Sequence, residues 1–261
     1  MNFDARKCTT NLLTVEDLHL SFGGLRVLNG VSFEVEEGTI CALIGPNGSG
    51  KTSVLNCINH FYPGKGTMTF KGHNISNVTS QQVAKLGIAR TFQNIALFKG
   101  MSVLENIKVG RHMAMKSGLL SGGIYFGRAR REEIRQRQFI EDEVIDILHL
   151  EGIRETIVGS LPYGKQKLVE LARALALNPQ LLILDEPSAG MNQEETEDMV
   201  RYILDVKLIW SLSVLLVEHN MDVVADIADA CCVLNHGVVI AFGTPDTVRQ
   251  NEAVIEAYIG N

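Results

Sequence analysis

Apolar and polar residues alternate with a period of two in the N-terminal part of the chain. The alternation covers Leu13–Leu20 and Val27–Val35, and the turn-prone pair Gly23-Gly24 lies between them. This pattern predicts two half-buried strands joined by a turn. Thr39–Ile44 is a continuous apolar run, which is typical of a strand buried on both faces. A further short stretch, Gly66–Lys71, has the pattern of an antiparallel strand.

Helical patterns and short apolar runs alternate in the rest of the chain. This order predicts an α/β protein with a parallel sheet. The predicted elements are helices at Lys51–Asn59, Gly164–Ala176 (closed by Asn178-Pro179) and Gln193 to about Lys207, and buried strands at Leu181–Leu184 and Ser213–Val217.

The middle of the chain departs from this alternation. Asn106–Leu150 has few strand signals, and its second half, from Arg128, is charged and amphipathic. Ser117–Gly127 is a glycine-rich connector. We therefore predict a helical insertion, with an apolar stripe of roughly helical period at Ile134, Ile140, Val144, Ile147 and Leu148.

Composition excludes several classes of protein. The 261 residues include 24 Lys+Arg and 30 Asp+Glu, so the formal net charge is −6. This balance argues against a nucleic-acid-binding protein, which usually carries a basic surface. No apolar run approaches the roughly 20 residues that cross a bilayer, and Met1–Thr10 lacks the apolar core of a signal peptide. The five cysteines lack CxxC spacing, so we expect reduced thiols and a cytosolic compartment.

The segment Gly45–Thr52 reads GPNGSGKT and matches GxxxxGK[ST] without a gap. It lies between a predicted strand and a predicted helix, which is the context of a P-loop. Glycines let backbone N–H groups turn toward phosphate oxygens at a helix N-terminus. Lys51 supplies charge to the β- and γ-phosphates, and Thr52 offers its hydroxyl to Mg²⁺. The predicted nucleotide-binding residues are Gly45, Pro46, Asn47, Gly48, Ser49, Gly50, Lys51, Thr52 and Ser53.

Two adjacent acidic residues follow the apolar run Leu181–Leu184. We expect the strand to carry Asp185 to its carboxyl end, where the carboxylate can hold Mg²⁺ through water. Glu186 comes next and can polarise an attacking water. Because a P-loop precedes them in the chain, this pair is interpreted as catalytic and not merely as a solvated strand end.

The segment Leu161–Gln166 reads LPYGKQ and, with LARAL at 171–175, resembles the signature loop of ABC ATPases, which usually reads LSGGQ. In that family the leucine of the loop precedes the Mg²⁺-binding aspartate by 24 residues, the separation of Leu161 and Asp185 here. A closer spelling, LSGGI at 120–124, lies 65 residues before Asp185 and is interpreted as a connector. The family resemblance covers essentially Leu13 to Ile259.

The resemblance implies roles for the signature loop. In the family its serine and a later glycine contact the γ-phosphate of the ATP held by the partner subunit, so Pro162, Tyr163 and Gly164 are expected to bind nucleotide. Pro162 stands in place of the serine and removes both the hydroxyl and the backbone donor. A lost hydrogen bond to a charged acceptor costs about 1.5–3 kcal/mol, so we expect a slower or partner-dependent ATPase.

Other positions take their roles from the same resemblance. Phe22 matches the aromatic residue that stacks on adenine, and Gln93 matches the glutamine that reaches Mg²⁺ and water. His219 matches the switch histidine that contacts the γ-phosphate. Ser188–Asn192 matches the D-loop of the family, and Asn192 stands where most members carry aspartate. The implied catalytic residues are Glu186, His219, Gln93 and Lys51, and the implied metal ligands are Thr52, Gln93 and Asp185.

The resemblance also implies the architecture, an α/β P-loop NTPase (ABC ATPase). We expect a mostly parallel core sheet, an antiparallel β subdomain and an inserted α-helical subdomain. The core and β subdomain would cover about 13–95 and 180–261, and the helical subdomain about 96–179. All belong to a single ABC ATPase domain over 13–261, which follows an N-terminal extension at 1–12.

Subgroup features resemble the LivG-type subunits of branched-chain amino acid importers. These are the tyrosine-glycine signature, the stretches AGMN (189–192) and EHNM (218–221), the ending AYIG (257–260) and an enlarged helical region around His112–Arg137. The implied function is to hydrolyse ATP and so energise uptake of branched-chain amino acids.

The implied partners are transmembrane permease subunits and a second ABC ATPase subunit, either a related chain or a second copy. A substrate-binding protein is an indirect partner, and no nucleic acid is expected. The chain would lie peripherally on the cytoplasmic face of the inner or plasma membrane. Alternatives are the same mechanism for urea, short amides or another small solute, a permease-independent ABC ATPase, and a nucleotide-gated scaffold.

Overall fold

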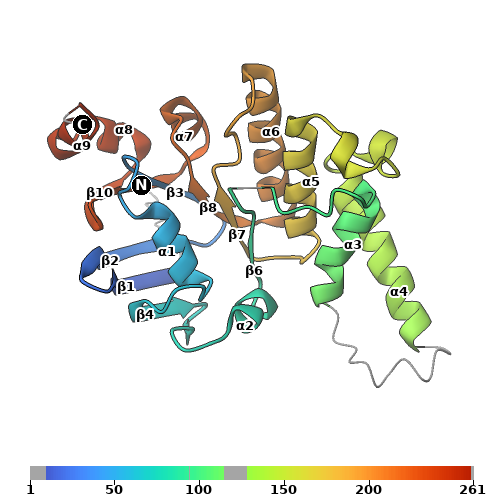
Figure 1. The fold of residues 1–261 in the computed structure, drawn as a ribbon, viewed down its shortest axis with the longest axis horizontal. Coiled ribbons are helices and arrows are strands. Elements are labelled where there is room, and N and C mark those ends of the chain that lie inside the picture. The colour runs from blue at the N-terminus through green and yellow to red at the C-terminus, as the bar shows by residue number, and fades with distance from the viewer. Residues whose placement is uncertain (1–9, 94, 115–127, 260–261) are drawn as a thin grey trace, which may run out of the picture. The chain divides into compact units, whose positions relative to one another are not determined.

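The computed structural model describes residues 10–93, 95–114 and 128–259 (Figure 1). The chain divides into two compact units, one formed by residues up to Val83 together with those from Ser211 onward, and one formed by Ala84–Trp210. α2 (Ser80–Lys85) crosses from the first unit into the second. The sequence-based subdomain boundaries stay a prediction.

The first unit contains an antiparallel sheet in the order β2-β1-β4-β5. Its strands are β1 (Asn11–Phe22), β2 (Leu25–Glu36), β4 (Lys65–Phe70) and β5 (His73–Asn74). The apolar alternation of β1 changes phase at a register shift between Val15 and Leu18, where Asp17 adopts a φ of 50°. The bulge keeps the leucines on both sides of it buried, since an extra residue restores the face they share.

The first unit also contains strands in the order β10-β9-β3-β8. They are β3 (Ile40–Ile44), β8 (Ser213–Val217), β9 (Ala230–Asn235) and β10 (Val238–Gly243). β3 pairs in parallel with both β8 and β9, and β9 and β10 form an antiparallel pair. All five residues of β3 and all five of β8 are buried, which accounts for their unbroken apolar sequences.

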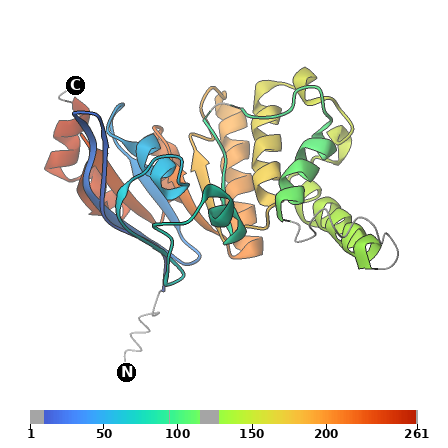
Figure 2. The same ribbon diagram turned by 60° about the horizontal axis from the view of Figure 1, so that its bottom comes forward.

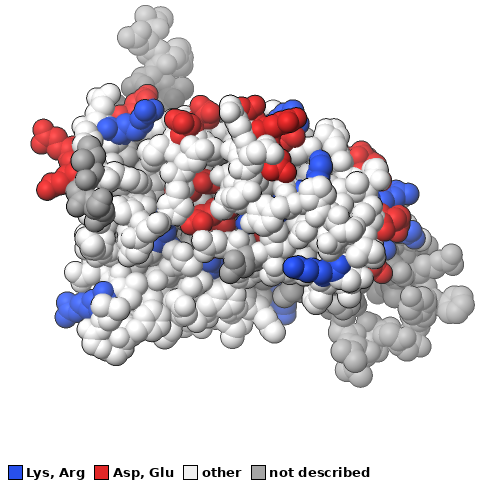
Figure 3. All heavy atoms as spheres, turned by 45° about the horizontal axis from the view of Figure 1, so that its top comes forward, with Lys and Arg blue, Asp and Glu red and all other residues white. Residues whose placement is uncertain are grey.

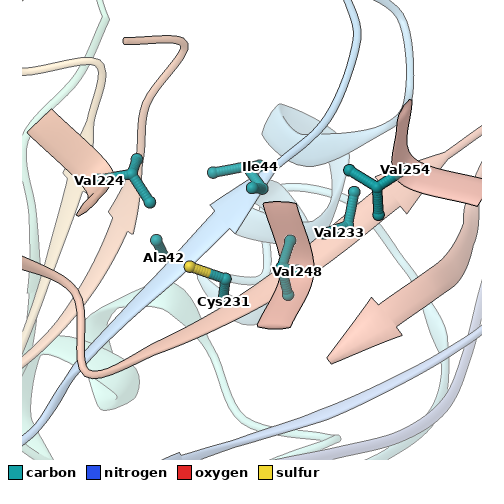
Figure 4. Close-up of a cluster of buried hydrophobic side chains, with 7 residues drawn as sticks. All are labelled: Ala42, Ile44, Val224, Cys231, Val233, Val248 and Val254. Carbon is teal, nitrogen blue, oxygen red and sulfur yellow. The ribbon is translucent and has the colours of Figure 1, made fainter. Parts of the chain in front are cut away.

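Helices pack around these strands in the first unit. They are α1 (Lys51–Ile58), α7 (Met221–Ile227), α8 (Pro245–Arg249) and α9 (Glu252–Ile259). Figure 4 shows one core cluster, in which Val248 of α8 and Val254 of α9 gather with Ala42 and Ile44 of β3. The last two helices thus cover the strand that leads into the P-loop.

The second unit contains two parallel strands, β6 (Ile88–Arg90) and β7 (Leu181–Asp185). Its helices include α3 (Val103–Ala114), α5 (Tyr163–Leu175) and α6 (Gln193–Trp210). Both ribbon views show α5 between α3 and α6 (Figures 1 and 2). The inward face of α5 is apolar except for two charged residues, Lys167 and Glu170.

The charged middle segment is helical, as expected, but its apolar stripe differs from the prediction. α4 (Arg128–Phe139) continues into a π-helix at Ile140–Ile145, and short 3₁₀ turns follow at Glu151–Ile153 and Val158–Ser160. Ile140, Val144 and Leu148 are buried, whereas Ile134 is half exposed, Ile147 is half-buried and Ile145 is buried in addition. The wider turn of the π-helix changes the phase of the buried face, so a single 3.6-residue period cannot describe it.

Most of the predicted elements are confirmed within one or two residues. β8 has the predicted bounds, α5 begins one residue earlier, and α6 runs three residues beyond Lys207. The connector Ser117–Gly127, which includes the LSGGI stretch, lies outside the described residues. Among the helices of the described ranges, none is long and apolar enough to cross a bilayer. Cys41, Cys57, Cys231 and Cys232 are free thiols and are buried.

Candidate functional site

The P-loop connects β3 to α1 and adopts a conformation that depends on its glycines. Gly45, Gly48 and Gly50 have φ angles of 146°, 79° and 109°. A Cβ atom at Gly45 would lie 2.0 Å from the carbonyl oxygen of Leu234, so no side chain fits there. The glycine spacing seen in the sequence is therefore a steric requirement of this turn as well as a binding motif.

The Lys51 side chain is folded into the P-loop. It is 5% exposed, and its Nζ donates to the carbonyl oxygens of Gly45 at 2.8 Å and Pro46 at 2.9 Å. The Ser49 hydroxyl is buried and, within the described ranges, has no hydrogen-bond partner. A buried ammonium, an unsatisfied hydroxyl and a helix N-terminus in one loop fit a phosphate group. Thr52 is exposed and Ser53 half-buried in the first turn of α1.

His219 follows β8 as the P-loop follows β3. Leu43 and Val217 are register partners in these parallel neighbours, so both segments leave the same edge of the sheet. His219 is exposed, and its backbone N–H donates to the Glu218 carboxylate at 3.1 Å. Asn220 caps α7 by accepting from the N–H groups of Asp222 and Val223. The predicted switch residue His219 therefore directly precedes a helix cap and is exposed.

Phe22 lies at the end of β1 with 47% of its surface exposed. Its ring packs edge-on against Tyr62, with centroids 5.0 Å apart and planes at 85°. An exposed aromatic ring of this kind is chemically suited to stacking on a base.

The predicted acidic residues lie at the carboxyl end of β7 in the second unit. Asp185 is 1% exposed, and its Oδ2 accepts from Arg90 Nη2 at 2.7 Å. Among the described atoms its Oδ1 has no hydrogen-bond partner. A buried carboxylate oxygen with unused acceptor capacity fits a hard cation such as Mg²⁺ or a water that binds it. Three or more His, Cys, Asp or Glu side chains do not gather into a metal cluster anywhere in the described ranges.

Glu186 is held in an uncommon conformation beside Gln93. Its φ is 52°, in the left-handed region that costs a residue with a side chain about 1–3 kcal/mol. Its Oε2 accepts from the Gln93 amide nitrogen at 2.8 Å. The structure thus joins two of the predicted catalytic residues directly, although they are 93 positions apart in the sequence.

The signature loop leads into α5. Pro162 is the N-cap residue of this helix, with φ −55° and ψ 153°, so the missing N–H breaks no helical hydrogen bond. Tyr163 is 44% exposed. A Cβ atom on Gly190 would lie 3.2 Å from the Tyr163 ring, and one on Gly164 would lie 2.5 Å from the Glu195 carboxylate. The signature loop and the D-loop therefore pack against each other within this chain.

Comparison with known proteins agrees with this geometry. The sequence model of the family described as "ABC transporter" matches residues 28–189. The chain belongs to the ABC transporter family. A second model, described as "Branched-chain amino acid ATP-binding cassette transporter", matches residues 238–261 of this ABC protein. As a member of the family the chain is an ATPase, as the resemblance of its motifs implied.

Named relatives span nearly the whole ABC chain. It is 40% identical over 256 residues to the high-affinity branched-chain amino acid transport ATP-binding protein LivG of Salmonella typhimurium, covering 95% of this chain and 98% of that protein. It is 38% identical to BraF of Pseudomonas aeruginosa, a protein of the same description, with the same coverage. The resemblance to LivG-type subunits is confirmed.

Solved structures confirm the predicted ABC ATPase fold. A nucleotide-free ATP-binding cassette from an ABC transporter superposes with a TM-score of 0.84 at 31% identity, covering 97% of this chain and 100% of that one. The ADP conformation of an ATP-binding cassette gives the same TM-score and coverage at 32% identity.

The predicted site residues belong to two different units. The P-loop, Phe22 and His219 belong to the first, and Gln93, Asp185, Glu186 and the signature loop belong to the second. Sequence reasoning missed the partner of Asp185, because Arg90 lies next to the Gln93 motif and carries no pattern of its own. It also missed two buried charges of α5, although a charged residue on the apolar face of a helix is a visible signal.

The D-loop residue Asn192 has a structural role in this ABC cassette. Its side-chain oxygen accepts from the Glu195 N–H at 2.9 Å, and the Glu195 carboxylate accepts from the Asn192 N–H at 3.1 Å. This reciprocal pair is a capping box at the start of α6. Asparagine and aspartate are equally good N-caps, so the departure from aspartate preserves the start of the helix.

The C-terminal segment also reaches the P-loop. Burial raises the pKa of the Tyr258 hydroxyl, and a hydrogen bond from the Gly45 N–H partly opposes this rise. Tyr258 belongs to α9, in the region matched by the branched-chain family model.

Proposed function

We propose that this chain is the ATP-hydrolysing subunit of an ABC importer that takes up branched-chain amino acids through a membrane permease. The observation that carries the proposal is the P-loop with its buried Lys51, in a chain that resembles LivG and BraF over 95% of its length. Both relatives are described as branched-chain amino acid transport proteins, and the segment 238–261 matches a model of the same description.

Within this proposal each part of the site has a role in phosphoryl transfer to water. The P-loop N–H groups and Lys51 hold the phosphates, and Phe22 stacks on the adenine. Thr52, Gln93 and Asp185 are the candidate residues for Mg²⁺, which when bound neutralises charge on the phosphate oxygens. The buried Asp185 Oδ1, which has no hydrogen-bond partner among the described residues, supports this assignment.

Glu186 is the proposed group that polarises the attacking water. Its carboxylate is oriented by the Gln93 amide at 2.8 Å, so the acceptor oxygen is positioned before the water arrives. His219 is the proposed contact to the γ-phosphate. Catalysis by this chain then consists of positioning and electrostatics.

A second ATPase subunit and a permease are the proposed partners, at the cytoplasmic face of the membrane. Pro162, Tyr163 and Gly164 would contact nucleotide held by the partner subunit. Pro162 offers no backbone donor, but Gly164 and the N-terminus of the 13-residue helix α5 follow it. Because these donors remain, we expect ATP hydrolysis to be slower but not abolished.

The test is uptake of labelled leucine, and separately of labelled urea, in cells that carry Lys51→Ala in this chain. Loss of leucine uptake alone is the expected result. Loss of urea uptake alone would change the proposed substrate class to urea and short amides. Unchanged uptake of both would overturn the importer assignment. Arg201→Met, on the exposed face of α6, is a matched control for the loss of a cation.

A nucleic-acid-dependent ATPase is the alternative that the surface does not favour. On the face drawn in Figure 3, described basic side chains are scattered among described acidic ones and form no extended basic patch. ATP hydrolysis by the purified chain, compared with Glu186→Gln, separates an enzyme from a nucleotide-gated scaffold. Equal rates for the two proteins would sink the enzymatic assignment.

A further inference from the structure

Two opposite charges lie buried side by side on α5, the helix that follows the signature loop. Lys167 is 3% exposed and Glu170 is 2% exposed. They are three residues apart and therefore share one face of the helix. Burying charges costs several kcal/mol per ion unless they are paired and hydrogen-bonded. Neither residue has a role in the proposed hydrolysis of ATP.

Both side chains hold the main chain next to Gln93. Lys167 Nζ donates to the carbonyl oxygen of Gln93 at 3.0 Å. Glu170 Oε1 accepts from the N–H of Phe92 at 3.3 Å. Residues 91–93 belong to neither a helix nor a strand, so their peptide groups need partners of this kind. The cation and the anion thus bind two consecutive residues of the loop.

The electrostatics of Glu170 depend on the same loop. Burial raises the pKa of the Glu170 carboxyl, and the Lys167 ammonium is the largest influence that opposes the rise. Hydrogen bonds from the N–H groups of Phe92 and Ala96 and the charge of Arg173, 3.9 Å away, act in the same direction as Lys167. Loop and helix therefore stabilise each other's charges.

The contacts of Lys167 and Glu170 with the loop at residues 91–93 have little room to rearrange. A cavity of about 10 Å³ borders Lys167, Glu170 and Thr91, which is about the space of a single water. Arg173 donates a further hydrogen bond to the carbonyl oxygen of Ala96. The loop on both sides of Gln93 is thus attached to one helix face.

We propose that Lys167 and Glu170 are positioning residues that fix the main chain at Phe92–Gln93, so that the Gln93 amide meets the Glu186 carboxylate. The Gln93 side chain is exposed and its backbone is the part held from behind. A shift of α5 moves this backbone, because both contacts arise from that helix. The inference rests on the proposed function, in which Gln93 and Glu186 act together in ATP hydrolysis.

The first experiment compares steady-state ATP hydrolysis by the wild type, Lys167→Met and Lys167→Arg. Methionine keeps the length of the side chain but removes the donor to the Gln93 carbonyl. Because small misplacements of catalytic groups can cost up to about 100-fold, we expect kcat to fall at least about tenfold. KM for ATP should stay within about twofold, and arginine should restore most of kcat. Lys85→Met, an exposed lysine of α2, is the control that should leave both constants unchanged.

A double-mutant cycle separates positioning from a general structural role. If Lys167 acts through Gln93, adding Lys167→Met to Gln93→Ala should lower kcat by less than about twofold. Independent effects would multiply, and a full tenfold loss in the Gln93→Ala background would overturn the proposal. So would an unchanged kcat in Lys167→Met alone. If Lys167→Met does not fold, the pair Lys167→Met/Glu170→Gln removes the same donor without leaving an unpaired buried charge and replaces it in the cycle.

The result that would contradict the ATPase function differs from the result that would contradict only the positioning role. A wild-type rate equal to that of Glu186→Gln would contradict the ATPase function itself. A normal wild-type rate, lost in Glu186→Gln but unaffected in the Lys167 variants, would contradict only the positioning role.

Discussion

Replacing Arg90 by methionine should destabilise the protein strongly, because it leaves the Asp185 carboxylate buried without its guanidinium. The two side chains are 4% and 2% exposed, and their closest atoms are 2.7 Å apart. Removing one partner of a buried ion pair costs about 3–5 kcal/mol, since the remaining charge is uncompensated. Methionine preserves much of the apolar bulk, so packing contributes little to the loss.

The chain offers a control with the same ion-pair distance and a different environment. Arg201 and Asp198 on α6 are also 2.7 Å apart, but their side chains are 61% and 46% exposed. Solvated pairs contribute about 0.2–1 kcal/mol. Arg201→Met should therefore lower the free energy of unfolding at least three times less than Arg90→Met. The difference between the two losses measures the effect of burial at a constant ion-pair distance.

Urea denaturation followed by the fluorescence of Trp210 is a suitable assay. Trp210 is the single tryptophan and ends α6, with its ring 5.7 Å from that of Phe139. With an m-value of about 2 kcal/mol/M, a loss of about 4 kcal/mol lowers the midpoint by about 2 M. Arg90→Met/Asp185→Leu removes both charges and should recover most of this loss. Equal midpoints for Arg90→Met and Arg201→Met would refute the reasoning.

Three further predictions concern other parts of the chain. Gly45→Ala should abolish nucleotide binding in a fluorescent-ATP titration, since its Cβ would lie 2.0 Å from the carbonyl oxygen of Leu234. Gly38→Ala is the control, because Gly38 has a φ of 73° but a Cβ there would meet no atom within 4 Å. It should lower stability by only about 1 kcal/mol and leave binding intact. Burial raises the pKa of the Glu170 carboxyl, so this group contributes stability that is present below its unfolded-state pKa of 4.5 and is lost as pH rises through its folded-state pKa. Glutamine does not titrate, so in urea titrations Glu170→Gln should gain stability relative to the wild type as pH increases above about 4.5. A stability difference that does not depend on pH would contradict this prediction. Burial raises the pKa of Cys57 to about 11, so only about one thiol in a thousand is ionised at pH 8, and peptide mapping after iodoacetamide treatment should show modification of Cys57 in urea but not in buffer.

The chemistry-bearing motifs could be predicted because their signals are local. GPNGSGKT needs only a strand before it and a helix after it, and β3 and α1 fit these bounds within one residue. Asp185 and Glu186 follow a run of four apolar residues that β7 confirms. In both places the residue types and the secondary structure point to the same conclusion.

The contacts between motifs could not be predicted, because they depend on which strands become neighbours. β6 has only three residues, too few for a periodic signal, yet its pairing with β7 brings Arg90 to Asp185. The Gln93–Glu186 hydrogen bond likewise follows from this pairing and from the left-handed backbone of Glu186. Long-range pairing of this kind is a tertiary effect, and sequence periodicity carries no information about it.

The position of β3 has a consequence for the order in which the molecule can be assembled. β3 is made early, but its parallel neighbours β8 and β9 and the cluster residue Val254 are made only near the other end of the described chain. During synthesis the strand that leads into the P-loop therefore has two unpaired edges, while the β1–β2 hairpin can already form from local contacts. Unpaired strand edges invite aggregation. A nascent chain thus acquires its ATP-binding scaffold late, and chaperone protection is most needed between the synthesis of β3 and that of α9.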